Sequence, residues 1–90
     1  MAAVSRIVII PNDHGLHARP VMRFVDMANQ FRSRIQVKKG DRLVDGKNPM
    51  EMMLLEATKG TQLEVLADGE DADGAVVALA GLILEGFGEM

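Results

Sequence analysis

The spacing of apolar residues changes several times along the ninety-residue chain, and this change constrains the fold more than any other feature. Short β-branched or alternating segments are typical of strands, whereas apolar residues three and four positions apart indicate amphipathic helices. The segments expected to form strands are Arg6–Ile10, Ser33–Lys39, Arg42–Asp45 and Thr61–Ala67. Helices between and after them give the order βαββαβα. Helices that can all cover one face of a sheet predict an α+β open sandwich.

The second helix has the clearest start and stop signals in the sequence. Asn48 supplies an N-cap oxygen, Pro49 takes the first helical position and Glu51 the third, and together they form a strong helix start. We expect this helix to run to about Thr58 and to stop at Gly60.

The first and last helices are indicated by their apolar faces. The first spans His17–Phe31 and has Pro20 in its first turn, where a missing N–H group is tolerated. The last opens at Asp71 and Asp73, whose charges suit the positive end of the helix dipole. Before the first helix, Gly15 permits a positive φ in a tight connection.

Composition excludes several classes of function. The chain is long enough for one domain, residues 1–90, and its 48% of apolar residues suffices for one core. The absence of cysteine excludes disulfides, thiolate metal ligands and a cysteine nucleophile. With no Trp, no Tyr and only three Phe, the chain has few of the aromatic platforms on which single-stranded nucleic acids stack, which nearly excludes that function. The N-terminus has no secretory-signal layout, and the longest apolar run, 75–84, is too short for a bilayer. We expect a cytoplasmic monomer that binds no nucleic acid and does not insert into a membrane.

Charge is divided unevenly between the two halves of the chain. Residues 1–47 carry nine Lys or Arg and four Asp or Glu, a net charge of +5. Residues 48–90 carry one Lys and nine Asp or Glu, a net charge of −8. A basic half and an acidic half suggest an anion or an acidic partner on one side. The alternative is that these charges only solvate loops and helix faces.

His17 is the strongest candidate for chemistry. It stands at a helix start, where backbone N–H groups lack partners and the helix dipole is positive. This environment favours an anion and a neutral, nucleophilic imidazole, and Arg19 can bring a guanidinium to the same place. Because Pro20 has no N–H, the backbone groups of Ala18 and Arg19 are the expected donors to a phosphoryl group on His17.

Two other interpretations of this segment remain. His17 can be a simple helix cap without chemistry. Alternatively, Asp13, His14 and His17 can form a metal site, although the two histidines lack the helical i, i+4 spacing and no second ligand cluster exists.

Three segments carry a resemblance to a known family. They are residues 15–20 (GLHARP), residues 59–65 (KGTQLEV) and residues 67–71 (ADGED). The first resembles the active-site signature of the histidine-containing phosphocarrier proteins, HPr, of the bacterial phosphoenolpyruvate-dependent phosphotransferase system. The others resemble the segment entering that family's last strand and the turn before its final helix. Length and element order also fit, so the resemblance covers essentially the whole chain.

The resemblance implies a four-stranded antiparallel sheet of order 1-4-2-3 with three helices on one face. It implies that His17 accepts a phosphoryl group from enzyme I through Nδ1, assisted by Arg19, and passes it to an EIIA-type domain. No metal or other cofactor is expected. Gram-positive members are also phosphorylated on a serine that starts the second helix. The matching residue here is Asn48, so regulation of that serine type is not expected.

Seven methionines are many for a chain of this length. On the second helix Met52 can face the core while its neighbours face outwards. Flexible apolar side chains ringed by arginines suit a carrier that must bind two partners in turn, and the alternative is core filling. The residues predicted to dock partners are Met22, Arg23, Met50 and Met53.

The expected function is therefore that of a phosphoryl carrier, a covalent relay rather than a free-standing enzyme. One rival is a regulatory or nitrogen-branch HPr-like protein that is not coupled to sugar uptake. The other is a small α+β binding module in which His17 is inert.

Overall fold

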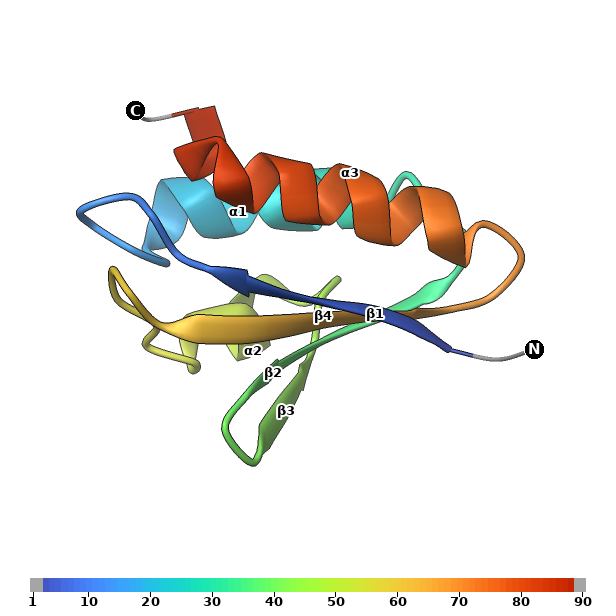
Figure 1. The fold of residues 1–90 in the computed structure, drawn as a ribbon, viewed down its shortest axis with the longest axis horizontal. Helices are drawn as coiled ribbons and strands as arrows, with labels where there is room; N and C mark the ends of the chain where they lie inside the picture. The colour runs from blue at the N-terminus through green and yellow to red at the C-terminus, as the bar shows by residue number, and fades with distance from the viewer. Residues whose placement is uncertain (1–2, 89–90) are drawn as a thin grey trace.

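A four-stranded antiparallel sheet carries all the helices on one face (Figure 1). The computed structural model describes residues 3–88. The strands are β1 (Val4–Ile9), β2 (Arg34–Lys39), β3 (Arg42–Asp45) and β4 (Gln62–Asp68). Their order in the sheet is β1-β4-β2-β3, with every neighbouring pair antiparallel. The predicted α+β open sandwich, its element order and its strand order are confirmed.

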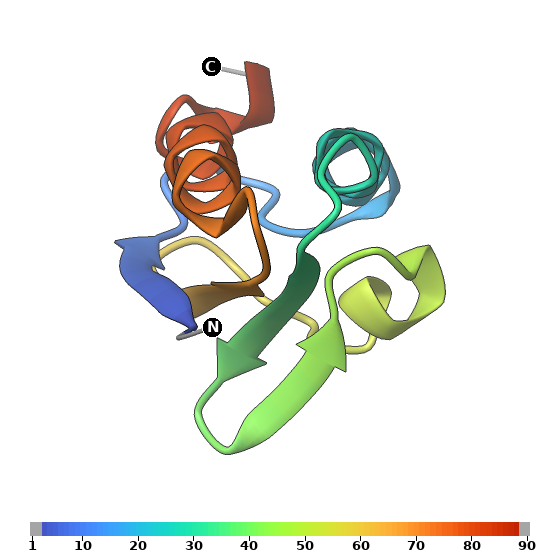
Figure 2. The ribbon, with the colours of Figure 1, turned by 90° about the vertical axis from the view of Figure 1, so that its right-hand side faces the viewer.

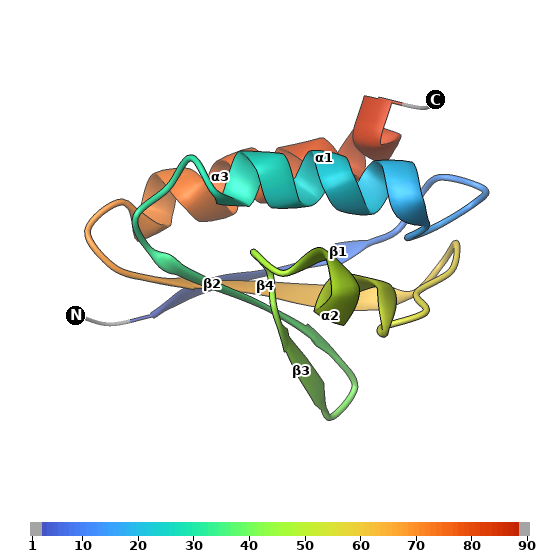
Figure 3. The same cartoon turned by 180° about the vertical axis from the view of Figure 1, so that it is seen from behind.

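Two long helices and one short helix cover the inner face of the sheet. They are α1 (Ala18–Ala28), α2 (Pro49–Met53) and α3 (Ala72–Leu84), followed by a short 3₁₀ turn, η1 (Gly86–Gly88). Viewed end-on, α3 lies over β1, while α1 and α2 lie on the side of β2 and β3 (Figure 2). From behind, α2 is seen below α1, beside the β2–β3 hairpin (Figure 3).

The core lies between the sheet and the helices. Side chains at every second position of β2 and β4, including Val37 and Val65, are buried against α1 and α3. Phe24 and Leu79 come from the two long helices and are fully buried. Within the described residues, no helix combines the length and the apolar character needed to cross a membrane.

Helix α1 ends three residues before the predicted end at Phe31. Its C-cap is Asn29, whose backbone N–H and side-chain amide both donate to the carbonyl of Val25, at 2.9 Å each. This local side-chain bond competes with continuation of the helix. Phe31 lies beyond the helix, half-buried, and packs against the core as its apolar spacing predicts.

Helix α2 is shorter than the sequence predicts, because it ends at Met53 rather than near Thr58. Two side chains of the β2–β3 hairpin take the carbonyls that follow: Lys39 Nζ donates to Leu55 at 2.8 Å, and Arg42 donates to the carbonyl of Leu54. The predicted stop at Gly60 is wrong, since its N–H donates to the carbonyl of Ile10 at 2.8 Å.

The start of α3 is tied to the distant loop between α1 and β2. Asp71 is the N-cap, but within the described residues its side chain makes no capping bond to α3. Its carboxylate instead accepts hydrogen bonds from the backbone N–H groups of Arg32 at 2.8 Å and Ser33 at 2.9 Å, and from the Ser33 hydroxyl. These hydrogen bonds join the start of α3 to the loop that precedes β2.

Candidate phosphoryl-transfer site

The loop between β1 and α1 is braced by the segment that follows α2. The N–H of Leu16 donates to the carbonyl of Ala57 at 2.8 Å. Gly15 has a φ of +63°, and a Cβ there would lie 2.4 Å from that same carbonyl oxygen. Asn12 closes the loop internally, since its amide donates to the Gly15 carbonyl at 3.0 Å. The predicted positive φ at Gly15 is confirmed, and the close approach adds a second reason for glycine.

Helix α1 starts directly after this braced loop. His17 is its N-cap with an extended backbone, φ −115° and ψ −168°, and its carbonyl accepts from the N–H of Val21 at 3.0 Å. Within residues 3–88 the His17 side chain makes no capping hydrogen bond to the helix. The backbone N–H groups of Ala18 and Arg19 belong to the first turn, where no intrahelical carbonyl can reach them. His17 and Arg19 are both exposed, so an imidazole and a guanidinium belong to the same helix start as these two N–H groups, at the positive end of the helix dipole.

His14 lies beside His17 in the loop that precedes α1. The two ring centroids are 5.5 Å apart and the ring planes are nearly perpendicular, at 83°. Asp13 turns to Lys59 instead, with its carboxylate oxygen 3.0 Å from Nζ. This hydrogen bond and the Lys59 charge hold the pKa of Asp13 below its ordinary value of 3.8. Among the described residues, no three His, Cys, Asp or Glu side chains gather as a metal site, which disfavours the metal interpretation of this segment.

The methionines of α1 and α2 are divided between the surface and the core. Met22 is 43% exposed, Met50 78% and Met53 40%, whereas Met52 is fully buried. The division of the α2 methionines between surface and core that the spacing predicted is confirmed. Arg23 is exposed, and its guanidinium lies 2.6 Å from the position a Cβ would take at Gly88.

Comparisons with known proteins identify the family. The model described as the PTS HPr component phosphorylation site matches residues 4–85. The phosphocarrier protein HPr of Neisseria meningitidis is 46% identical over 86 residues, covering 96% of this chain and 97% of that protein. This chain belongs to the HPr family. It is similar throughout to the crystal structure of HPr-C-His from Thermoanaerobacter tengcongensis, with a TM-score of 0.90, 39% identity and coverage of 100% and 99% of the two chains.

HPr-family domains also occur within longer proteins. One is the phosphoryl donor subunit DhaM of a phosphoenolpyruvate-dependent dihydroxyacetone kinase from Klebsiella michiganensis. It is 36% identical over 87 residues, which cover 97% of this chain but 18% of that protein. The family assignment makes the chain a phosphocarrier of the phosphotransferase system, as the resemblance implied.

Two further features of this HPr-family chain concern the second helix. The Asn48 side chain accepts from the N–H groups of Met50 at 3.0 Å and Glu51 at 3.1 Å, so the predicted N-cap is confirmed. Glu51 does not complete a capping box; its carboxylate accepts from the N–H of Asp45 at 3.1 Å. Leu54 is the C-cap of α2 and is 61% exposed, and no sequence pattern singled it out.

Proposed function

We propose that His17 is the phosphoryl acceptor of this phosphocarrier and that Nδ1 is the attacking atom. The observation that carries the proposal is the position of His17 at the N-cap of α1, directly before the first-turn backbone N–H groups of Ala18 and Arg19. A neutral imidazole offers its lone pair to phosphorus, a new N–P bond forms, and the donor's bond to phosphorus breaks. The donor retains the electron pair of that bond, so no redox step is involved.

The residues after His17 would stabilise the transferred group. A phosphoryl group on the ring carries negative charge, and it would meet the backbone N–H groups of Ala18 and Arg19, the positive helix end and the Arg19 guanidinium. Hydrogen bonds to charged groups contribute about 1.5–3 kcal/mol each, so this set is a strong local stabiliser. Pro20 fixes the first turn without consuming an acceptor.

The proposed donor is phosphorylated enzyme I, and the proposed recipient is an EIIA-type domain of a sugar transporter. The similarity to HPr proteins over nearly the whole chain supports this order of transfer. A recipient outside sugar uptake, in a regulatory or nitrogen branch, is the second candidate. The likeness to the phosphoryl donor subunit of a phosphoenolpyruvate-dependent dihydroxyacetone kinase favours keeping it, since that relative is named for a kinase and not for a sugar transporter.

Incubation with phosphoenolpyruvate and enzyme I tests the acceptor. One phosphate that is labile in acid and stable in base should appear on the wild-type chain, and none on His17→Ala. His14→Ala is the matched control, because it removes the neighbouring ring and should keep acceptance within a few-fold. Phosphate on His17→Ala would contradict the assignment, and an unmodified wild-type chain would favour the inert binding module. Transfer to a panel of purified acceptor domains then separates the sugar branch from the others.

We propose that partners dock on the methionine surface formed by Met22, Met50 and Met53, with Leu54 and Arg23 beside it. Exposed apolar side chains at such a surface lose water only in the complex. Met50→Glu should therefore weaken enzyme I binding about tenfold or more while leaving the melting temperature nearly unchanged.

Two variants control the docking experiment. Val77→Glu changes an equally apolar side chain, 56% exposed on α3, and should leave affinity unchanged. Met52→Ala empties a buried position and should lower stability by about 2–5 kcal/mol. A large fall in melting temperature for Met50→Glu with normal affinity would show that Met50 is structural.

A further inference from the structure

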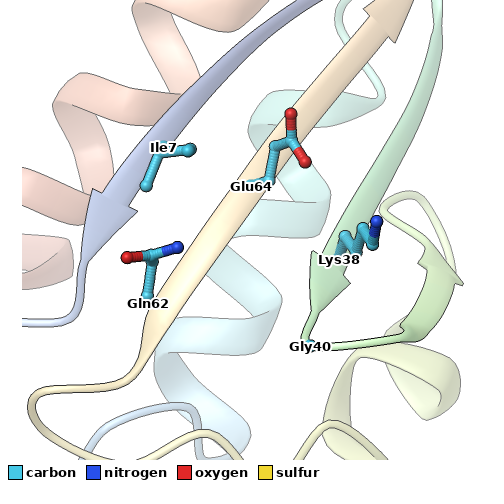
Figure 4. A pocket seen from close by; sticks show the side chains of 5 residues that line it. All are labelled: Ile7, Lys38, Gly40, Gln62 and Glu64. Carbon is cyan, nitrogen blue, oxygen red and sulfur yellow. The ribbon is translucent and has the colours of Figure 1, made fainter.

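The outer face of the sheet, opposite the helices, is left uncovered by the fold (Figures 1 and 4). Apolar side chains stand on it at both edges: Ile7 is 58% and Ile9 is 49% exposed on β1, and Leu43 is 50% exposed on β3. A shallow hollow lies between them, lined by residues of β1, β4, β2 and the hairpin turn at Gly40 (Figure 4). The apolar side chains at the two edges of this face are area that a contact with another molecule would remove from water.

The two central strands of this outer face carry opposite charges. The outward acidic residues are Glu64 and Asp68 on β4, and the outward basic residues are Arg34 and Lys38 on β2. In the register of the sheet Lys38 stands opposite Glu64 and Arg34 opposite Asp68. No ion pair within residues 3–88 joins the members of either pair. The uneven charge of the sequence thus has a spatial form: β2 belongs to the basic half and β4 to the acidic half.

One row of outward side chains crosses the whole sheet, with one residue from each strand. The strand register places Ile7, Glu64, Lys38 and Leu43 side by side on β1, β4, β2 and β3. Figure 4 shows the first three on neighbouring strands, with the helices on the far side. The row reads apolar, acidic, basic, apolar. Reversed, it reads apolar, basic, acidic, apolar, which is its electrostatic complement.

A two-fold axis performs this reversal. An axis that runs along the strands, midway between β4 and β2, sets each β4 above the partner copy's β2. Glu64 of one copy then faces Lys38 of the second copy, and Lys38 faces the second Glu64. Ile7 faces Leu43 at both edges. The same axis sets Asp68 over Arg34 four residues along, so both charged rows match at once. Sheets pack face to face in this manner, with their strands within about 30° of each other.

We propose that the outer face of the sheet binds a second copy of this chain, in a two-fold dimer that pairs β4 of each copy with β2 of the other. The contact is small. Four strands about 4.8 Å apart and roughly 20 Å long offer about 400 Å² per copy, half of a standard interface. We expect a dissociation constant of roughly 0.1–1 mM, so the chain is monomeric when dilute. His17 starts a helix on the inner face, and the dimer leaves it exposed.

Sedimentation equilibrium at up to about 2 mM chain, above the expected dissociation constant, tests the dimer. Wild type should associate, whereas Glu64→Lys and Lys38→Glu should each stay monomeric, because each places like charges opposite one another. An equimolar mixture of these two variants should associate, since the basic face of one fits the acidic face of the other. The double variant Lys38→Glu/Glu64→Lys should dimerise again. Asp73→Lys, an exposed reversal on α3, is the matched control and should dimerise like wild type.

Three results would overturn the proposal: a wild type that stays monomeric at 2 mM, single reversals that associate as wild type does, or a mixture that fails to associate. The last would show that Lys38 and Glu64 act only within one chain, where opposed charges stabilise neighbouring strands. Phosphoryl acceptance is expected to be unchanged in all these variants, so a failed dimer leaves the proposed carrier function untouched.

Discussion

The starts of α1 and α2 differ in how their first N–H groups are satisfied. Both follow an extended N-cap residue. At α2 the Asn48 oxygen accepts from two N–H groups, so the start of that helix is closed by its own side chain. At α1, within the described residues, the His17 ring makes no such bond. One helix start is thus closed by its own N-cap side chain, whereas the first-turn N–H groups of the other receive no bond from the side chain of its N-cap residue.

The open start of α1 is held in place by contacts from outside the helix. Leu16 is bonded to Ala57, and Gly15 approaches the same carbonyl more closely than any side chain would allow. The closed start of α2 has no need of such bracing, because Asn48 fixes it locally. We therefore expect α1 to be sensitive to changes in the loop, and α2 to changes in its cap.

Gly15→Ala should have the largest effect on stability of the three substitutions. A residue with a Cβ is strained at a φ of +63°, and this Cβ would clash with backbone atoms of Ala57 and Thr58. We expect a loss of about 2–5 kcal/mol of stability, from the left-handed backbone and the forced displacement together. Denaturant unfolding measures it. Gly40→Ala is the control, since its φ is +60° with nothing within 4 Å, and should cost only about 1–2 kcal/mol. Equal losses in the two variants would show that the brace at Ala57 is unimportant.

Asn48→Ala should have the next largest effect. It removes the acceptor of two backbone N–H groups and should lower the free energy of unfolding by about 1 kcal/mol, as loss of an N-cap does. Asn48→Ser keeps a capping oxygen and should stay near wild type. The rate of phosphoryl acceptance by His17 should not change in either variant. An undiminished stability of Asn48→Ala would mean that Pro49 and packing define α2 without the cap.

His17→Asp should have the smallest effect on stability, and with the opposite sign. An aspartate at this extended N-cap position can accept from the first-turn N–H groups and suits the helix dipole, which should raise stability by about 0.5–1 kcal/mol. Phosphoryl acceptance should be lost at the same time. Thermal unfolding and phosphorylation of one sample measure both. A destabilised His17→Asp would show that the wild-type ring already supports the helix start.

The sequence predicts most of the fold because most of it follows from local patterns. Alternation in β2 and β4 reports burial on one side of a sheet, and the boundaries of β3 were predicted to the residue. The end of α2 was missed because Lys39 and Arg42, from another element, take the carbonyls beyond it.

The candidate site was predictable to a similar degree. The position of His17 at a helix start follows from local signals, including Pro20 in the next turn. The residues that surround His17 in space do not follow from local signals. The contact with His14 depends on the path of the loop, and that path is set by Ala57, forty residues further along the chain.

The carboxylate of Asp71 has a consequence for behaviour in acid. Its hydrogen bonds from the Ser33 hydroxyl, and then from the backbone of Arg32 and Ser33, lower the pKa of Asp71 from an ordinary 3.8 to about 2. Above pH 3.8 its stabilising effect is complete. As pH falls from there to about 2, the unfolded chain takes up a proton that the native chain does not, and the native state loses stability. Acid therefore weakens the tie between α3 and the loop before β2, at the end of the sheet away from His17.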